Sequence, residues 1–118
     1  LKMSRNYNDF RNWERWGDLQ LGFDEKWVKN ILAQWPYLMS VAVDNSDYDM
    51  ILELEELKKV VLTTKFTKKQ SRRLALYMMG YSIKEIAEKE GITVMMVHKS
   101  LVPCFKKISK RMIGGGFV

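Results

Sequence analysis

Apolar residues recur at helical spacing along most of the chain. In its middle, Met50, Leu54, Leu57 and Val61 are four, three and four positions apart, which places them on one face of a helix. A second apolar face follows Asp24, the predicted N-cap of its helix. That face comprises Trp27, Val28, Ile31, Leu32 and Trp35. The pattern predicts an all-α domain of five or six helices.

Capping signals set the predicted starts of the later helices. A serine or threonine followed three positions later by an acid or amide is the capping-box pattern. It occurs at Ser46–Asp49, Thr67–Gln70 and Ser82–Glu85. Thr93 is placed to cap the last helix. The helix that begins after Thr67 is expected to turn four residues inward: Leu74, Ala75, Tyr77 and Met78.

Proline and glycine mark the predicted helix ends. Pro36 is expected to end or kink the helix before it, because proline lacks the N–H donor and clashes with the preceding turn. The apolar segment "YLMSVAV" that follows is best continued as helix. Gly80 and Gly91 are predicted to end the next two helices. Pro103, about ten residues into the last helix, is expected to end or bend it.

Residues 1–45 are predicted to form an N-terminal helical segment that completes the core, mediates oligomerisation or contacts a partner. A stripe with a period of three residues, ending near Gly17, is formed by Tyr7, Phe10, Trp13 and Trp16. We favour core packing for the four tryptophans, with a dimerisation surface or a docking face for RNA polymerase as the alternatives. Residues 113–118, which include the run "GGGFV", are predicted to be a flexible tail.

Charge divides the chain into two halves. Residues 1–62 hold 8 Lys/Arg and 11 Asp/Glu, a net charge of −3, whereas residues 63–118 hold 12 Lys/Arg and 3 Asp/Glu, a net charge of +9. A basic half attracts polyanions and makes their binding depend on salt. A solubilising surface is the alternative, but solubility does not require one sign of charge to collect in one half. The asymmetry favours a nucleic-acid partner.

Catalysis finds no support in the sequence, and we expect no enzyme activity and no cofactor. No Ser/His/Asp order and no glycine-rich phosphate loop is present. The single histidine and single cysteine, His98 and Cys104, cannot complete a tetrahedral zinc site, so we expect no metal. No apolar run is long enough to span a membrane, and the first residues lack the core of a signal peptide. We therefore expect a cytoplasmic protein.

A helix-turn-helix is indicated near the C-terminus. Two steeply crossing helices need a small residue at their approach, a turn residue that tolerates positive φ, and apolar residues between them. Ala87 and Gly91 fit the first two requirements. The apolar positions are Ile86, Ile92, Val97 and Leu101.

The segment from Phe66 to Met112 resembles region four of bacterial sigma factors, which reads the −35 promoter element, and the related motif of small phage transcription regulators. The matching residues are "TKKQ" from Thr67, "GYS" from Gly80, "KEIA" from Lys84, "GIT" from Gly91 and "VHKSL" from Val97. With the helix before it, the resemblance covers residues 46–112. Glu90 departs from the family, which often has a packed apolar residue at its place.

The resemblance implies that the helix starting at Val94 enters the major groove of double-stranded DNA. The implied base-reading residues are Thr93, Met95, Met96, His98 and Lys99. The implied phosphate contacts, which position the protein without reading sequence, are Lys68, Lys69, Arg72, Arg73, Lys84, Lys106, Lys107, Lys110 and Arg111. Methionine offers bases only apolar contact, so Met95 and Met96 reduce the hydrogen-bonded readout.

We predict a sequence-specific DNA-binding transcriptional regulator of bacterial or phage origin, associated with the nucleoid. Two-fold DNA half-sites would require a homodimer, which the sequence does not establish. Adjacent exposed methionines are typical of adaptable protein contacts. The alternative is therefore a protein-interaction helix-turn-helix that binds RNA polymerase or a host regulator. A phage DNA-packaging recognition subunit is a further alternative, and it would need a ring-forming oligomer.

Overall fold

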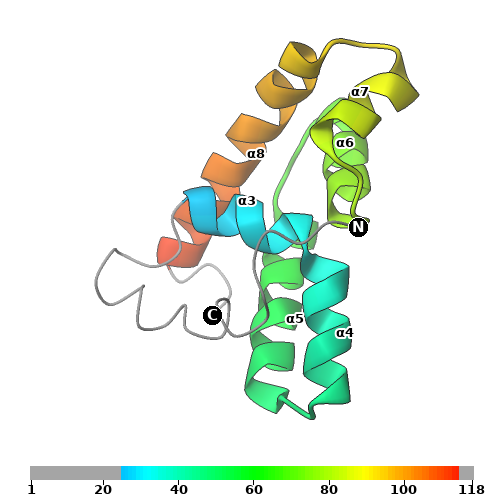
Figure 1. Ribbon diagram of the computed structural model, residues 1–118. Coiled ribbons are helices and arrows are strands. Elements are labelled where there is room, and N and C mark those ends of the chain that lie inside the picture. The colour runs from blue at the N-terminus through cyan, green and yellow to red at the C-terminus, as the bar shows by residue number, and fades with distance from the viewer. Residues whose placement is uncertain (1–24, 115–118) are drawn as a thin grey trace.

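The computed structural model describes residues 25–114, and within this range the α-helix is the only regular secondary structure (Figure 1). Its six helices are α3 (Glu25–Ala33), α4 (Trp35–Asp44), α5 (Tyr48–Thr63), α6 (Lys68–Met78), α7 (Ile83–Glu90) and α8 (Val94–Ile113). The all-α prediction is confirmed. The predicted helix before Gly17, the predicted cap Asp24 and residues 115–118 of the predicted tail lie outside the described residues.

Pro36 lies in the first turn of α4, after α3 has ended at Ala33. Proline fits there because the first N–H groups of a helix have no partner within the helix. The helical reading of "YLMSVAV" is confirmed, since this segment falls inside α4. Trp35, predicted on the face of the earlier helix, instead begins α4 and donates its indole N–H to the Leu54 carbonyl at 3.1 Å.

The capping box predicted at Ser46 is wrong by one residue. Asp47 is the N-cap of α5, and its carboxylate accepts the N–H of Met50 at 3.2 Å. Ser46 instead occupies the tight turn after α4 with a φ of 52°, in the left-handed region. A residue in that conformation belongs to the turn, so the following aspartate takes the capping position.

The helices share one hydrophobic core that continues across the predicted domain boundary at residues 45 and 46. Met50, Leu54, Leu57 and Val61 are all buried on α5, as their spacing predicts. On α6 the prediction is only partly right, because Leu74 and Tyr77 are buried, Met78 is half-buried and Ala75 is exposed. Tyr77 also donates its hydroxyl to the Lys29 carbonyl at 3.2 Å, which joins α6 to α3.

The helix α8 runs through Pro103 without ending, so of the two outcomes predicted for this residue, an end or a bend, the end is wrong. Pro103 lies on the exposed side of α8 and removes only the bond to the carbonyl four residues earlier, that of Lys99. The opposite side is held by a continuous set of buried side chains: Val97, Leu101, Cys104, Phe105, Ile108 and Met112. This side packs on α3, α5, α6 and α7, and those contacts keep the helix continuous past the proline.

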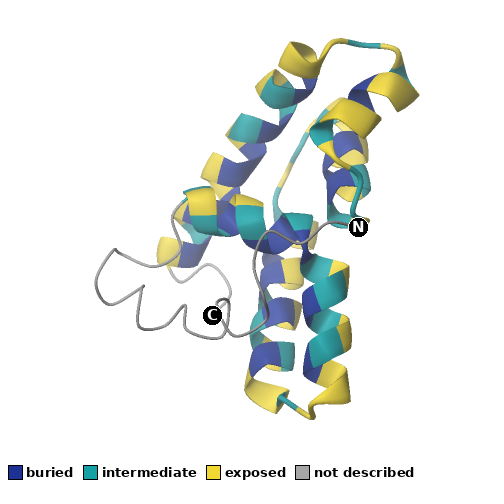
Figure 2. Ribbon diagram, in the orientation of Figure 1, coloured by how far each residue is buried: buried dark blue, intermediate teal, exposed yellow. Residues whose placement is uncertain are grey.

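The arrangement places two prominent features at opposite ends of the molecule. Figure 1 shows the α4–α5 hairpin projecting at one end and the α7–α8 turn at the other, with α8 along one side. In Figure 2 the turn between α4 and α5 is exposed, whereas buried residues line the surfaces that the helices share. Among residues 25–114, no helix is both long and apolar enough to cross a membrane.

Candidate nucleic-acid interface

The connection between α7 and α8 is fixed by local hydrogen bonds. Ser82 and Glu85 form a complete capping box: the Glu85 N–H donates to Ser82 Oγ at 3.1 Å, and the Ser82 N–H donates to Glu85 Oε1 at 2.8 Å. The Ser82 N–H, and after it the Ser82 hydroxyl, hold the pKa of the Glu85 carboxyl below its usual value. Gly91 ends α7 with a φ of 66°, and the next N–H, that of Ile92, donates to the Ala87 carbonyl at 3.0 Å. The start of α8 is therefore set at a defined place relative to α7.

Apolar packing holds α7 and α8 together. Ile86, Val97 and Leu101 are fully buried and Ala87 is nearly so, while Ile92 is half-buried. Burial of the small Ala87 side chain lets the two helices approach closely. These five residues lie where α7 and α8 meet, as their spacing in the sequence predicts.

The exposed face of α8 carries a line of positive charge. With 3.6 residues per turn, the steps from Lys99 to Lys106 and to Lys110 return to within about 20° of the same direction. All three lysines are exposed, and Met95 precedes them on the same face. The helix contains five Lys/Arg and no Asp/Glu. Beyond the apolar first turn, its solvent-facing side therefore carries positive charge and no negative charge, with Pro103 and Ile113 as its exposed apolar residues.

The predicted base-reading residues lie at the exposed start of α8. Thr93, Met95, Met96 and Lys99 are exposed, and His98 is half-buried. The Thr93 hydroxyl oxygen accepts the Met96 N–H at 3.2 Å, so this side chain caps the helix and retains its hydroxyl hydrogen for another acceptor. Met95 exposes 63% of its surface, so its thioether side chain is accessible to a partner.

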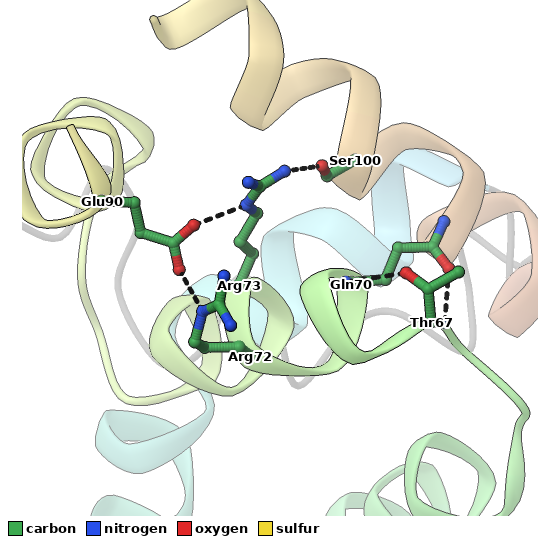
Figure 3. A network of polar contacts seen from close by, with 6 residues as sticks. All are labelled: Thr67, Gln70, Arg72, Arg73, Glu90 and Ser100. Atoms are coloured by element: carbon green, nitrogen blue, oxygen red, sulfur yellow. Dashed lines mark hydrogen bonds and ion pairs between the residues drawn. The ribbon is translucent and has the colours of Figure 1, made fainter. Parts of the chain in front are cut away.

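A polar network joins α6 to both α7 and α8 (Figure 3). Arg72 and Arg73 each donate their Nε–H to one oxygen of Glu90 at 2.7 Å, and Arg73 also donates to the Ser100 hydroxyl. The Arg73 and Glu90 side chains are only 8% and 10% exposed, while Arg72 is largely exposed. The hydrogen bonds from Arg72 and then Arg73 hold the pKa of Glu90 below its usual value.

This network changes the predicted phosphate contacts on α6. Arg73 is buried and committed to Glu90 and Ser100, so it cannot reach a DNA backbone in this structure. Arg72 is exposed but shares the same carboxylate, and that interaction raises its pKa. The network also explains the acidic residue at position 90, because Glu90 neutralises Arg73 at the joint. Sequence spacing carries no signal for this partnership, since the residues are 17 and 18 positions apart.

Two predicted phosphate contacts on α8 are also used within the fold. Arg111 donates to the Val60 carbonyl at 3.0 Å and to the hydroxyls of Thr63 and Thr64 at 2.9 and 2.7 Å. A cation there is favoured because the last carbonyls of α5 lack partners within the helix. Lys107 donates to the Lys65 carbonyl at 3.2 Å and lies over the Phe66 ring. Through these hydrogen bonds, both side chains connect α8 to the end of α5 and the segment that follows it.

The remaining predicted phosphate contacts stay accessible. Lys68 and Lys69 are exposed in the first turn of α6, Lys84 is exposed in the first turn of α7, and Lys106 and Lys110 belong to the cationic face of α8. Within residues 25–114, no ion pair engages any of these five lysines.

Across the described part of the chain, no group of His, Cys, Asp and Glu side chains is arranged to hold a metal ion. Comparisons with family models, curated proteins and solved structures find no match to this chain.

Proposed function

We propose that the protein is a DNA-binding transcriptional regulator in which α7 and α8 act as a sigma-region-four-like helix-turn-helix. The observation that carries the proposal is the acid-free face of α8, where Lys99, Lys106 and Lys110 point in one direction. A major groove about 12 Å wide admits an α-helix, and lysines along the helix supply phosphate contacts at its edges. The exposed first turn of α8 would then face the bases.

The chemistry of this first turn predicts a mixed readout. Lys99 can donate to a guanine edge, and the half-buried His98 can donate to a base or a phosphate. Met95 and Met96 present apolar surface that suits the thymine methyl group. A preferred site would therefore combine a guanine with neighbouring thymines, and its discrimination would depend on few hydrogen bonds.

Binding to duplex DNA at several salt concentrations tests the proposal. Fluorescence anisotropy with labelled duplexes should show affinity that falls steeply as salt rises. Replacing Lys106 and Lys110 with alanine should weaken all duplexes alike and reduce the log–log salt slope by about 2. The matched control replaces Lys26 and Lys29, two exposed lysines of α3, with alanine. It should change the affinity and the salt slope less than the change on α8 does. The absence of salt-dependent binding to any duplex would reject the proposal.

The exposed methionines support a second candidate, a protein-binding use of the same motif. Met95 and Met96 lie beside the exposed Val94, and together they form an adaptable apolar surface at the start of α8. In this second proposal, the partner is RNA polymerase or another transcription protein. Loss of partner capture in a Met95→Ala/Met96→Ala variant, in a protein that binds no duplex, would favour it.

A further inference from the structure

The outer face of α5 carries exposed residues at the spacing of a helix-pairing seam. Tyr48, Leu52, Glu55, Lys59 and Leu62 are separated by four, three, four and three positions. That spacing is the one at which helices pair along a continuous seam. Tyr48, Leu52 and Leu62 are 71%, 63% and 73% exposed, although apolar residues at such positions normally face another helix. All five point away from the face that α5 buries in the core.

The order of these residues is self-complementary when two copies of α5 run antiparallel. A two-fold axis at the level of Leu57 places Leu52 against the partner's Leu62 and Glu55 against the partner's Lys59. Symmetry repeats each contact, so the seam gains two apolar pairs and two ion pairs. Glu55 and Lys59 are four residues apart and could pair within their own helix, but no such ion pair forms in the described structure. Both charges remain available for a partner.

A hollow beside the far end of the seam suits the remaining residue, Tyr48. The hollow measures about 280 Å³ and lies between α5 and α6. Its apolar lining includes Val61, Leu62, Phe66 and Met78. In the antiparallel register, Tyr48 extends past the partner's Leu62 toward the end of α5 that borders this hollow. A cavity of about 150 Å³ is enough to hold benzene, so the hollow has room for an aromatic ring.

We propose that α5 is a homodimerisation surface whose occupant is α5 of a second copy, antiparallel to the first. The charge order favours a second copy over an unrelated partner, because in this symmetric register each Glu55 faces a Lys59 of the other copy and both charges are paired across the seam. Two 16-residue helices bury less surface than a standard interface of about 800 Å² per partner. The dimer is therefore weak and depends on protein concentration.

This pairing is independent of DNA binding. Figure 1 places the α4–α5 hairpin at the end of the molecule opposite the α7–α8 turn, so the paired helices leave the start of α8 uncovered. Association can therefore be measured without DNA, and its failure would say nothing about the cationic face of α8.

Sedimentation velocity over a range of concentrations tests the register directly. The wild-type chain should approach twice its mass of 13.9 kDa as concentration rises. Glu55→Lys places a lysine against the partner's Lys59, and Lys59→Glu places an acid against the partner's Glu55. Each single change should raise the dissociation constant at least tenfold, since facing like charges are strongly unfavourable. The double variant Glu55→Lys/Lys59→Glu restores both pairs and should return to within about threefold of wild type.

Matched controls distinguish an effect of the seam on association from an effect of the overall charge. Glu88→Lys on α7 and Lys26→Glu on α3 make the same charge changes at exposed positions away from α5, and should associate like wild type. Circular dichroism should be unchanged in all variants, because the four residues are exposed. A wild-type chain that stays monomeric at every concentration overturns the proposal. A double variant that associates as weakly as the single variants also overturns the proposal. That result would mean that the chain pairs in another register or with another protein.

Discussion

Replacing Glu90 by leucine should destabilise the protein strongly. In the wild type, the Arg73 side chain is 8% exposed, and its charge is neutralised by the Glu90 carboxylate at 2.7 Å. Without that carboxylate, Arg73 keeps only the Ser100 hydroxyl as a side-chain partner in the network. Removing one member of a buried ion pair costs about 3 kcal/mol or more, because an uncompensated charge remains buried. For a chain of 118 residues this corresponds to a fall in Tm of about 12 °C.

A double variant shows whether this cost comes from the stranded charge. Replacing Arg73 by methionine as well removes the cation and fills similar space with apolar atoms. Exchange of a complete buried ion pair for apolar side chains is often close to neutral. The Arg73→Met/Glu90→Leu variant should therefore recover most of the stability lost in Glu90→Leu, with a coupling free energy of about 2 kcal/mol between the two positions.

Urea unfolding followed by circular dichroism gives the free energies needed for this cycle. The wild type, both single variants and the double variant are measured at pH 7 and at one salt concentration. A Glu90→Leu variant that loses less than about 1 kcal/mol of unfolding free energy would refute the reasoning. So small a loss would mean that the Arg73 charge is solvated by water and not buried. Additive effects of the two changes would refute it as well, since they would show that the residues do not interact.

Two further predictions concern titratable groups. Arg72 and Arg73 hold the pKa of Glu90 below its usual value, so its stabilisation is complete above the ordinary glutamate pKa and is lost as pH falls through the lower folded-state pKa. A Glu90→Gln variant should therefore lose less stability than wild type between pH 5 and pH 3 in thermal unfolding, while the Glu85 contribution remains in both. Burial raises the pKa of the Cys104 thiol to about 11, and the residue is fully buried. A thiol reagent at pH 8 should modify it more slowly in the native protein than in urea, by on the order of a hundredfold, and equal rates would contradict its burial.

The helices could be predicted from the sequence because their signals are local. Capping at Thr67 and Ser82, the left-handed Gly91 and the buried face of α5 follow from residues within one or two turns of each other. The wrong cap at Ser46 has a local cause, the left-handed turn, whereas the errors at Pro103 and Ala75 concern positions that tertiary packing decides. The sequence predicts that Pro103 ends or bends its helix, but packing against four other helices keeps that helix continuous. It also predicts that Ala75 points inward, whereas the structure leaves Ala75 exposed.

The site could be predicted only in part, because sequence shows which charges exist but not which are already paired. The exposed positions of Lys99 and Lys106 follow from helical periodicity on an amphipathic segment. The commitment of Arg73 to Glu90, and of Arg111 to the end of α5, joins residues 17 or more positions apart. No local pattern reports such a pairing, so the basic half of the chain looks more available to DNA than it is.

This difference gives the proposed DNA binding a measurable test. Nine phosphate contacts would give a log–log salt slope of about 8, since each contributes about 0.9. The fold commits Arg72, Arg73, Lys107 and Arg111 to internal partners. Five lysines remain, and with Lys99 they give at most about 5. A measured slope near 8 would mean that the Glu90 network opens when DNA binds, which would loosen the joint that orients α8. We expect the lower value, because the same arginines cannot both hold the α7–α8 turn and neutralise phosphates.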